Sequence, residues 1–78
     1  MTTKEKQAIK AFALQAEILR DKIITLKNAY QQKLDEESAK DPTSNKFSEQ
    51  ESVYFYLDSA ADFLYRCTGE LQNIIDPV

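Results

Sequence analysis

The most constraining feature of this chain is the stretch from Lys4 to Ala39, which contains neither glycine nor proline. Most of its residues are good helix formers, so the sequence predicts one long helix over about residues 4–39. Apolar residues recur along it in alternating steps of three and four, the spacing of a left-handed coiled-coil seam. The predicted seam consists of Ile9, Phe12, Ala16, Leu19, Ile23, Leu26 and Tyr30.

A turn is predicted over residues 40–47, because Pro42 cannot continue a helix and the polar residues beside it offer competing local hydrogen bonds. Ser48 and Glu51 have the spacing of a capping box, which predicts that a second helix begins at Ser48 and runs to about residue 75. Its apolar residues again alternate in steps of four and three. They are Val53, Leu57, Ala60, Leu64, Cys67, Leu71 and Ile74.

Two helices with facing seams predict an all-α fold, a two-helix antiparallel hairpin that forms a single domain over residues 1–78. A domain of this size buries only about 60% of the surface that its unfolded chain exposes, so its core is marginal by itself. Cys67 is the only cysteine and the chain has no histidine. A disulfide is therefore excluded within one chain, a zinc site is not expected, and self-association remains as the source of additional stability.

Apolar residues outside the two seams also predict self-association. In a hairpin each helix has one neighbour, whereas in a four-helix bundle each helix has two and can bury a wider apolar surface. We therefore expect two hairpins to form a homodimer, or a higher oligomer, with a four-helix bundle at its centre. The residues expected to carry this association are Phe12, Leu14, Ile18, Leu19, Leu26, Leu57, Phe63, Leu64 and Leu71.

Acidic residues four apart occur on both predicted helices, as Glu17 with Asp21 and as Asp58 with Asp62. Counted from the seams, all four occupy outer positions, where carboxylates are solvated and do not converge on a metal. Asp62 and Arg66 are expected to form an ion pair one helical turn apart. The sequence predicts no catalytic residue, no metal site and no cofactor, so we expect a protein that is not an enzyme. Cys67 is interpreted as a small buried side chain on the seam.

The net charge is −3, from 10 basic and 13 acidic residues. Because nucleic-acid affinity depends on cationic groups that neutralise phosphates, we expect no nucleic-acid partner. The sequence has no uninterrupted apolar stretch of membrane-spanning length and no signal-peptide pattern at its start. These features predict a cytoplasmic protein that does not bind membranes.

Two outward aromatic residues, Phe55 and Tyr65, are not explained by either seam, and we interpret them as the binding site for an unidentified protein partner. The expected function is then that of a regulator, inhibitor or adaptor. A second interpretation remains open, in which rings and cations form a pocket for a small nucleotide-type ligand. The residues predicted for that pocket are Tyr54, Tyr56, Arg20 and Arg66.

Overall fold

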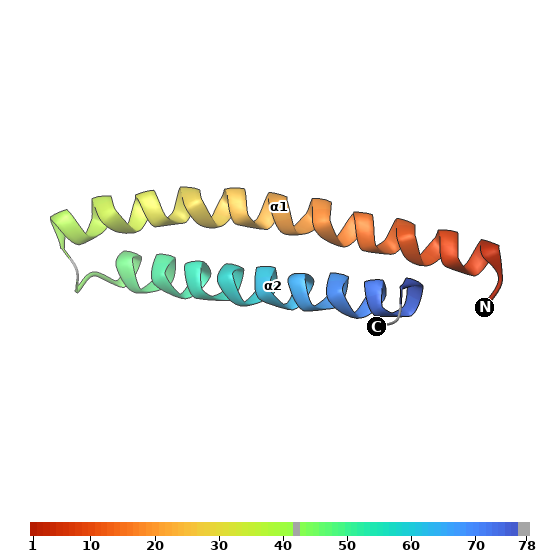
Figure 1. Cartoon of the computed structure of the whole chain (residues 1–78). Helices are drawn as coiled ribbons and strands as arrows, with labels where there is room; N and C mark the ends of the chain where they lie inside the picture. The colour runs from red at the N-terminus through yellow and green to blue at the C-terminus, as the bar shows by residue number, and fades with distance from the viewer. Residues whose placement is uncertain (42, 77–78) are drawn as a thin grey trace.

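The computed structural model describes residues 1–41 and 43–76, and it consists of two antiparallel helices joined by a short loop (Figure 1). Helix α1 spans Thr3–Lys40 and helix α2 spans Asn45–Ile75. The molecule measures 57 × 17 × 16 Å, so it is a rod of the length that α1 alone has. The predicted all-α helical hairpin is confirmed.

Both ends of α1 are closed by local hydrogen bonds. The Thr2 hydroxyl accepts from the backbone N–H of Glu5 at 3.1 Å and donates to the Glu5 carboxylate at 3.1 Å. At the other end the backbone N–H of Asp41 donates to the Glu37 carbonyl at 2.8 Å. The bonds to the Glu5 N–H and the Glu37 carbonyl satisfy backbone groups near the helix ends, and the bond between the Thr2 and Glu5 side chains supports the cap.

The loop begins with Asp41, whose carboxylate accepts from the hydroxyl and the backbone N–H of Thr43 at 2.7 and 3.0 Å. These bonds hold the pKa of the Asp41 carboxyl below its ordinary value. A salt bridge of 3.3 Å between Lys46 and Glu37 also links the two helices at this end. The predicted break at Pro42 lies outside the described residues.

The predicted start of α2 at Ser48 is wrong, because the helix begins one turn earlier. Ser44 is the cap, and its hydroxyl accepts from the backbone N–H of Phe47 at 3.0 Å. Ser48 already lies in the helix, where its N–H donates to the Ser44 carbonyl at 3.2 Å. The earlier start brings Phe47, which is half-buried against α1, into the helix.

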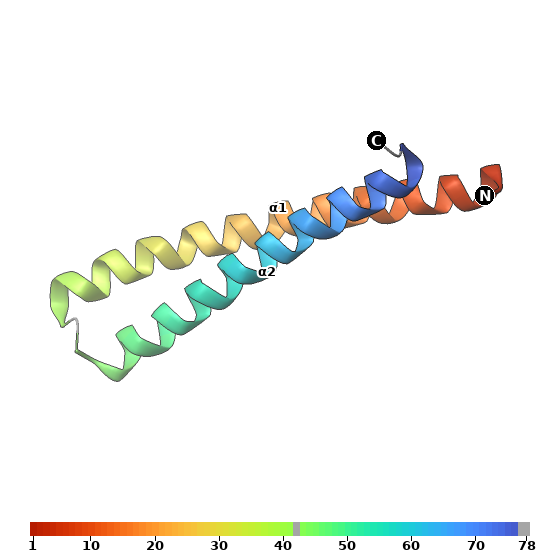
Figure 2. The same cartoon turned by 60° about the horizontal axis from the view of Figure 1, so that its bottom comes forward.

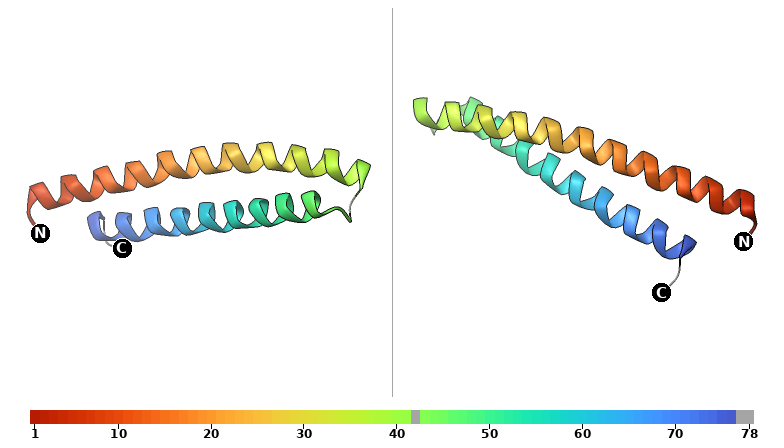
Figure 3. Two further views of the ribbon diagram at one scale, coloured as in Figure 1. Left: turned by 180° about the vertical axis from the view of Figure 1, so that it is seen from behind. Right: turned by 45° about the horizontal axis from the view of Figure 1, so that its top comes forward.

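The helices are inclined to one another and stay close along their length (Figures 2 and 3). They meet along heptad-spaced rows, as predicted, but each helix is rotated by part of a turn from the predicted seam. The residues of α1 that are buried or half-buried against α2 are Ile9, Ala13, Ala16, Arg20, Ile23, Ile24, Lys27, Tyr30, Leu34 and Glu37. Those of α2, where Ala60 is half-buried as well, are Phe47, Gln50, Tyr54, Leu57, Ala61, Leu64, Thr68, Leu71 and Ile75.

Three of the seven residues in each predicted seam are therefore exposed instead of buried against the other helix. On α1 the predicted residues Phe12, Leu19 and Leu26 are 54%, 49% and 49% exposed, and the residues that follow them in sequence take their places. On α2 the residues that follow in sequence likewise take the seam positions, and the predicted residues Val53, Cys67 and Ile74 are exposed.

Small side chains make up most of the buried residues of the hairpin. The buried apolar residues of the described chain are Ala13, Ala16, Leu34 and Ala61, three of which are alanines. Alanine at a contact lets two helix backbones come close, whereas a phenylalanine or leucine there would hold them apart. The rotation thus buries alanines between the helices beside half-buried larger residues, and it leaves Phe12, Leu19 and Leu26 exposed.

Candidate interaction surface

The rotation leaves two rows of exposed or half-exposed apolar side chains, one on each helix. Each residue in these rows precedes a seam residue in the sequence. The same rule also places charged residues on this side, Lys22 and Lys33 on α1 and Glu49 and Glu70 on α2. We define the apolar face as these residues: Phe12, Leu19, Leu26, Val53, Tyr56, Ala60, Phe63, Cys67 and Ile74.

Both rows lie on the same side of the hairpin. Stepping back one residue from a seam position rotates the side chain by about 100° in the same sense about either helix axis. Because α1 and α2 are antiparallel and face each other, these two rotations point to the same side. The apolar face is therefore one continuous surface built by both helices.

The opposite side of the hairpin is charged, and its residues bond across the helices. Lys27 of α1 donates to the Asp58 carboxylate of α2 at 2.9 Å. The Arg20 guanidinium lies 5.1 Å from the centre of the Tyr65 ring, in a cation–π contact. Hydrogen bonding to Asp58 raises the pKa of the Lys27 ammonium above its ordinary value. We call the residues on this side the charged face: Lys10, Glu17, Arg20, Lys27, Asp58, Asp62 and Tyr65.

Other predicted interaction residues are exposed but lie elsewhere. Ile18 is two positions from both Ala16 and Arg20 of the seam, so it points away from α2. Leu14 lines a shallow hollow with Ile75 beside the charged face. Phe55 is exposed on the outer side of α2, where its ring packs edge-on against Tyr54 with centroids 5.8 Å apart.

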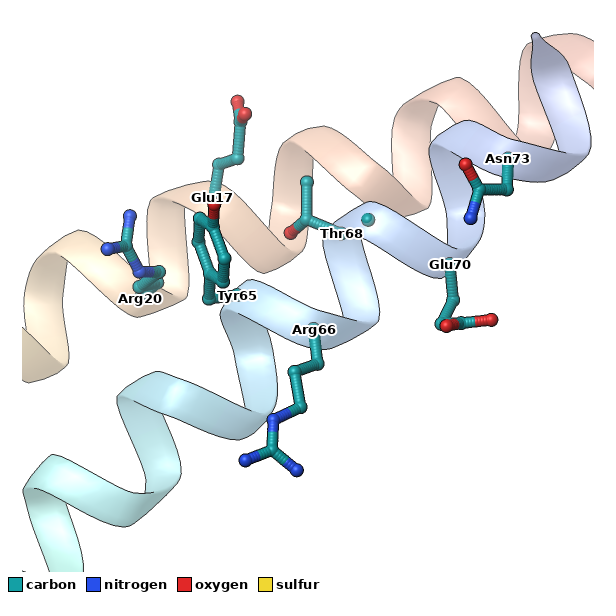
Figure 4. A pocket seen from close by; sticks show the side chains of 8 residues that line it. Glu17, Arg20, Tyr65, Arg66, Thr68, Glu70 and Asn73 are labelled. Atoms are coloured by element: carbon teal, nitrogen blue, oxygen red, sulfur yellow. The ribbon is translucent and has the colours of Figure 1, made fainter. Parts of the chain in front are cut away.

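A cavity of about 440 Å³ lies on the charged face near the C-terminal end of α2 (Figure 4). Arg20 and Tyr65 lie side by side there, while Arg66 and Glu70 extend from the side of α2 away from α1. Of the predicted pocket residues, Arg20 and Arg66 line it and Tyr54 and Tyr56 do not. The full lining consists of Glu17, Arg20, Tyr65, Arg66, Thr68, Gly69, Glu70 and Asn73.

Sequence reasoning missed Glu17, Thr68, Gly69, Glu70 and Asn73 as lining residues. Gly69 carried a signal, since a glycine inside a helix costs about 1 kcal/mol relative to alanine. Among the described residues, no atom outside its own stretch of helix lies within 4 Å of where a Gly69 Cβ would be. Packing within the hairpin therefore does not require a glycine at this position.

The predicted ion pair between Asp62 and Arg66 is confirmed, at 2.8 Å. In the described part of the chain, no group of three or more acidic, cysteine or histidine side chains is placed to hold a metal ion. Cys67 is exposed, so its interpretation as a buried seam residue is wrong. Thr68 takes that seam position, and its hydroxyl donates to the Leu64 carbonyl at 3.0 Å.

No protein-family model, curated protein or solved structure matches this chain. Within residues 1–41 and 43–76, neither helix has an apolar stretch long enough to cross a membrane.

Proposed function

We propose that this chain is a cytoplasmic, non-enzymatic interaction protein, which self-associates and binds another protein as a regulator, inhibitor or adaptor. The observation that carries the proposal is the apolar face, whose large side chains the hairpin leaves exposed. Contiguous exposed apolar surface on a small protein is typical of protein–protein interaction sites. The buried residues of the hairpin are mostly alanines, whereas Phe12, Leu19 and Phe63 remain exposed.

The mass in solution tests self-association. Light scattering over a tenfold concentration series is expected to give a multiple of the 9.0 kDa chain mass. Thermal melts at each concentration should shift upward with concentration, because association that occurs only in the folded state stabilises it by mass action. A single chain mass at every concentration, with a constant melting temperature, would contradict self-association.

Binding of a second protein is assigned to Phe55 and Tyr65, which are exposed away from the apolar face. Replacing both with alanine should leave helicity and mass unchanged and reduce binding of that protein. Leu14→Ala is the matched control, because Leu14 is also an exposed apolar residue outside the apolar face. Equal binding by the wild type and the double variant would remove this assignment.

The cavity on the charged face favours a second candidate function, binding of a small anionic aromatic ligand such as a nucleotide. Tyr65 offers a ring for stacking, and the Arg20 Nε is buried without a hydrogen-bond partner among the described residues. Titration with nucleotides and cyclic dinucleotides should then raise the melting temperature, and Arg20→Gln should abolish the shift. No shift with any of these compounds would exclude this candidate.

A further inference from the structure

We propose that the apolar face is covered by the same face of a second copy of this chain, so that the charged faces point outward on both sides of a four-helix bundle. The inference rests on the proposed self-association and specifies the surface that performs it. It assigns the contact to Phe12, Leu19 and Leu26 of α1 and to the α2 residues of the apolar face.

The exposed area of the single chain supports a partner on this face. A folded monomer of this mass exposes about 4,850 Å². The hairpin exposes 5946 Å². The excess of about 1,100 Å² is larger than the roughly 800 Å² that each partner contributes to a standard protein–protein interface. One copy of the chain thus has enough surplus surface to form a stable dimer.

The chemistry of the face favours a second copy over a different protein. In a two-fold dimer the same patch meets itself, so a patch with a net charge would repel its own image. The charged residues on this side are Lys22 and Lys33 on α1 with Glu49 and Glu70 on α2. They are of both signs, so they add no net charge to the patch. On the charged face, Lys27 contacts Asp58 and Arg20 contacts Tyr65 within one chain. These contacts therefore do not require a second copy of the chain.

Two neighbouring residues of α1 provide a matched test. Leu19 and Ile18 are 49% and 47% exposed, but Leu19 belongs to the apolar face and Ile18 points away from α2. Leu19→Glu should raise the dissociation constant of the dimer by about 30-fold or more, the effect expected at the centre of an interface. Ile18→Glu should change it less than about threefold. Far-UV circular dichroism checks that both variants remain helical.

A second pair on α2 keeps the test valid if Leu19→Glu does not fold. Phe63 of the apolar face is 66% exposed, and Tyr65 of the charged face is 63% exposed. Phe63→Glu should dissociate the dimer, and Tyr65→Glu should not. Dissociation by Ile18→Glu or Tyr65→Glu, with no effect of Leu19→Glu or Phe63→Glu, would assign the dimer to another surface and leave self-association intact.

Cys67 reports on the same face without a mutation. Its thiol is exposed in the single hairpin, so its reaction with a maleimide should slow as protein concentration rises and the dimer covers it. The concentration dependence should disappear in Leu19→Glu. A constant reaction rate in a wild type that light scattering shows to be dimeric would overturn the proposed face. A wild type that stays monomeric would overturn both this inference and the self-association.

Discussion

The two sides of this hairpin are built from the same pair of helices and differ in what their residues bond to. On the charged face, Lys27 contacts Asp58 and Arg20 contacts Tyr65 across the helix pair. On the apolar face, Leu19 and Phe63 remain exposed. The difference arises from rotation alone, because a heptad pattern distributes residues around a helix and the choice of seam decides which row faces outward. A fold of two helices can thus separate surfaces of opposite chemistry.

The largest expected effect concerns the seam that separates the two faces. Ala61 is buried at the helix contact, whereas its neighbour Ala60 is half-buried beside the apolar face. Ala61→Leu overpacks the contact and should destabilise the protein by about 1–3 kcal/mol, while Ala60→Leu should have a smaller effect. Urea unfolding of both variants at equal concentration measures the difference. The reverse order would mean that the helices meet along the seam predicted from sequence, in which case the two faces would not exist as described.

A smaller and opposite effect is expected at Gly69, which lines the cavity of the charged face. Gly69→Ala should stabilise the protein by about 1 kcal/mol, because alanine favours the helix and the described structure leaves room for its methyl group. The midpoint of urea unfolding measures the change. A loss of stability instead would indicate that a neighbouring molecule fills this space, so that the charged face is covered as well.

The smallest effect concerns the ion pair of the charged face, because exposed pairs contribute little to stability. Since the pKa of Lys27 is raised above its ordinary value of 10.5, the folded protein holds this proton more tightly than the unfolded chain. The contribution is therefore complete below the ordinary pKa and is lost as pH rises through the folded-state value. Lys27→Met should slightly lower the melting temperature at neutral pH and reduce the loss of stability above pH 10.5.

The matching measurement is a pair of thermal melts, at neutral and at alkaline pH, on the wild type and Lys27→Met. The relevant quantity is the difference between the two proteins, because any other effect of alkaline pH is common to both. An identical alkaline loss in both would show that the bond to Asp58 does not stabilise the fold. The mass of Lys27→Met should equal that of the wild type, since the apolar face is unchanged.

Much of the hairpin can be predicted because its signals are local. The absence of glycine and proline from Lys4 to Ala39 predicts α1 almost to its ends, and a four-residue spacing predicts the pair of Asp62 and Arg66. The start of α2 was missed because both Ser44 and Ser48 can cap a helix. The choice between them depends on whether Phe47 packs against α1, which only the assembled helix pair decides.

The sequence by itself determined the two helices and the apolar residues that belong to both the predicted and the observed seam. These residues are Ile9, Ala16, Ile23 and Tyr30 on α1 with Leu57, Leu64 and Leu71 on α2. On each helix, the row of residues on either side of the shared row can complete a seam with coiled-coil spacing. The periodicity of the sequence is therefore compatible with two rotations of each helix about its own axis. Hydrophobicity favours the row of Phe12, Leu19 and Leu26, whereas the tertiary structure selects Ala13, Arg20 and Lys27.

The physical reason lies in what the second helix supplies. Ala61 of α2 is buried, and its small side chain lines the same hollow as Arg20 and Lys27 of α1. The charged ends of Arg20 and Lys27 reach Tyr65 and Asp58. These contacts depend on the other helix, so the sequence pattern of one helix alone does not predict them. Only the packed pair therefore decided which apolar residues face outward.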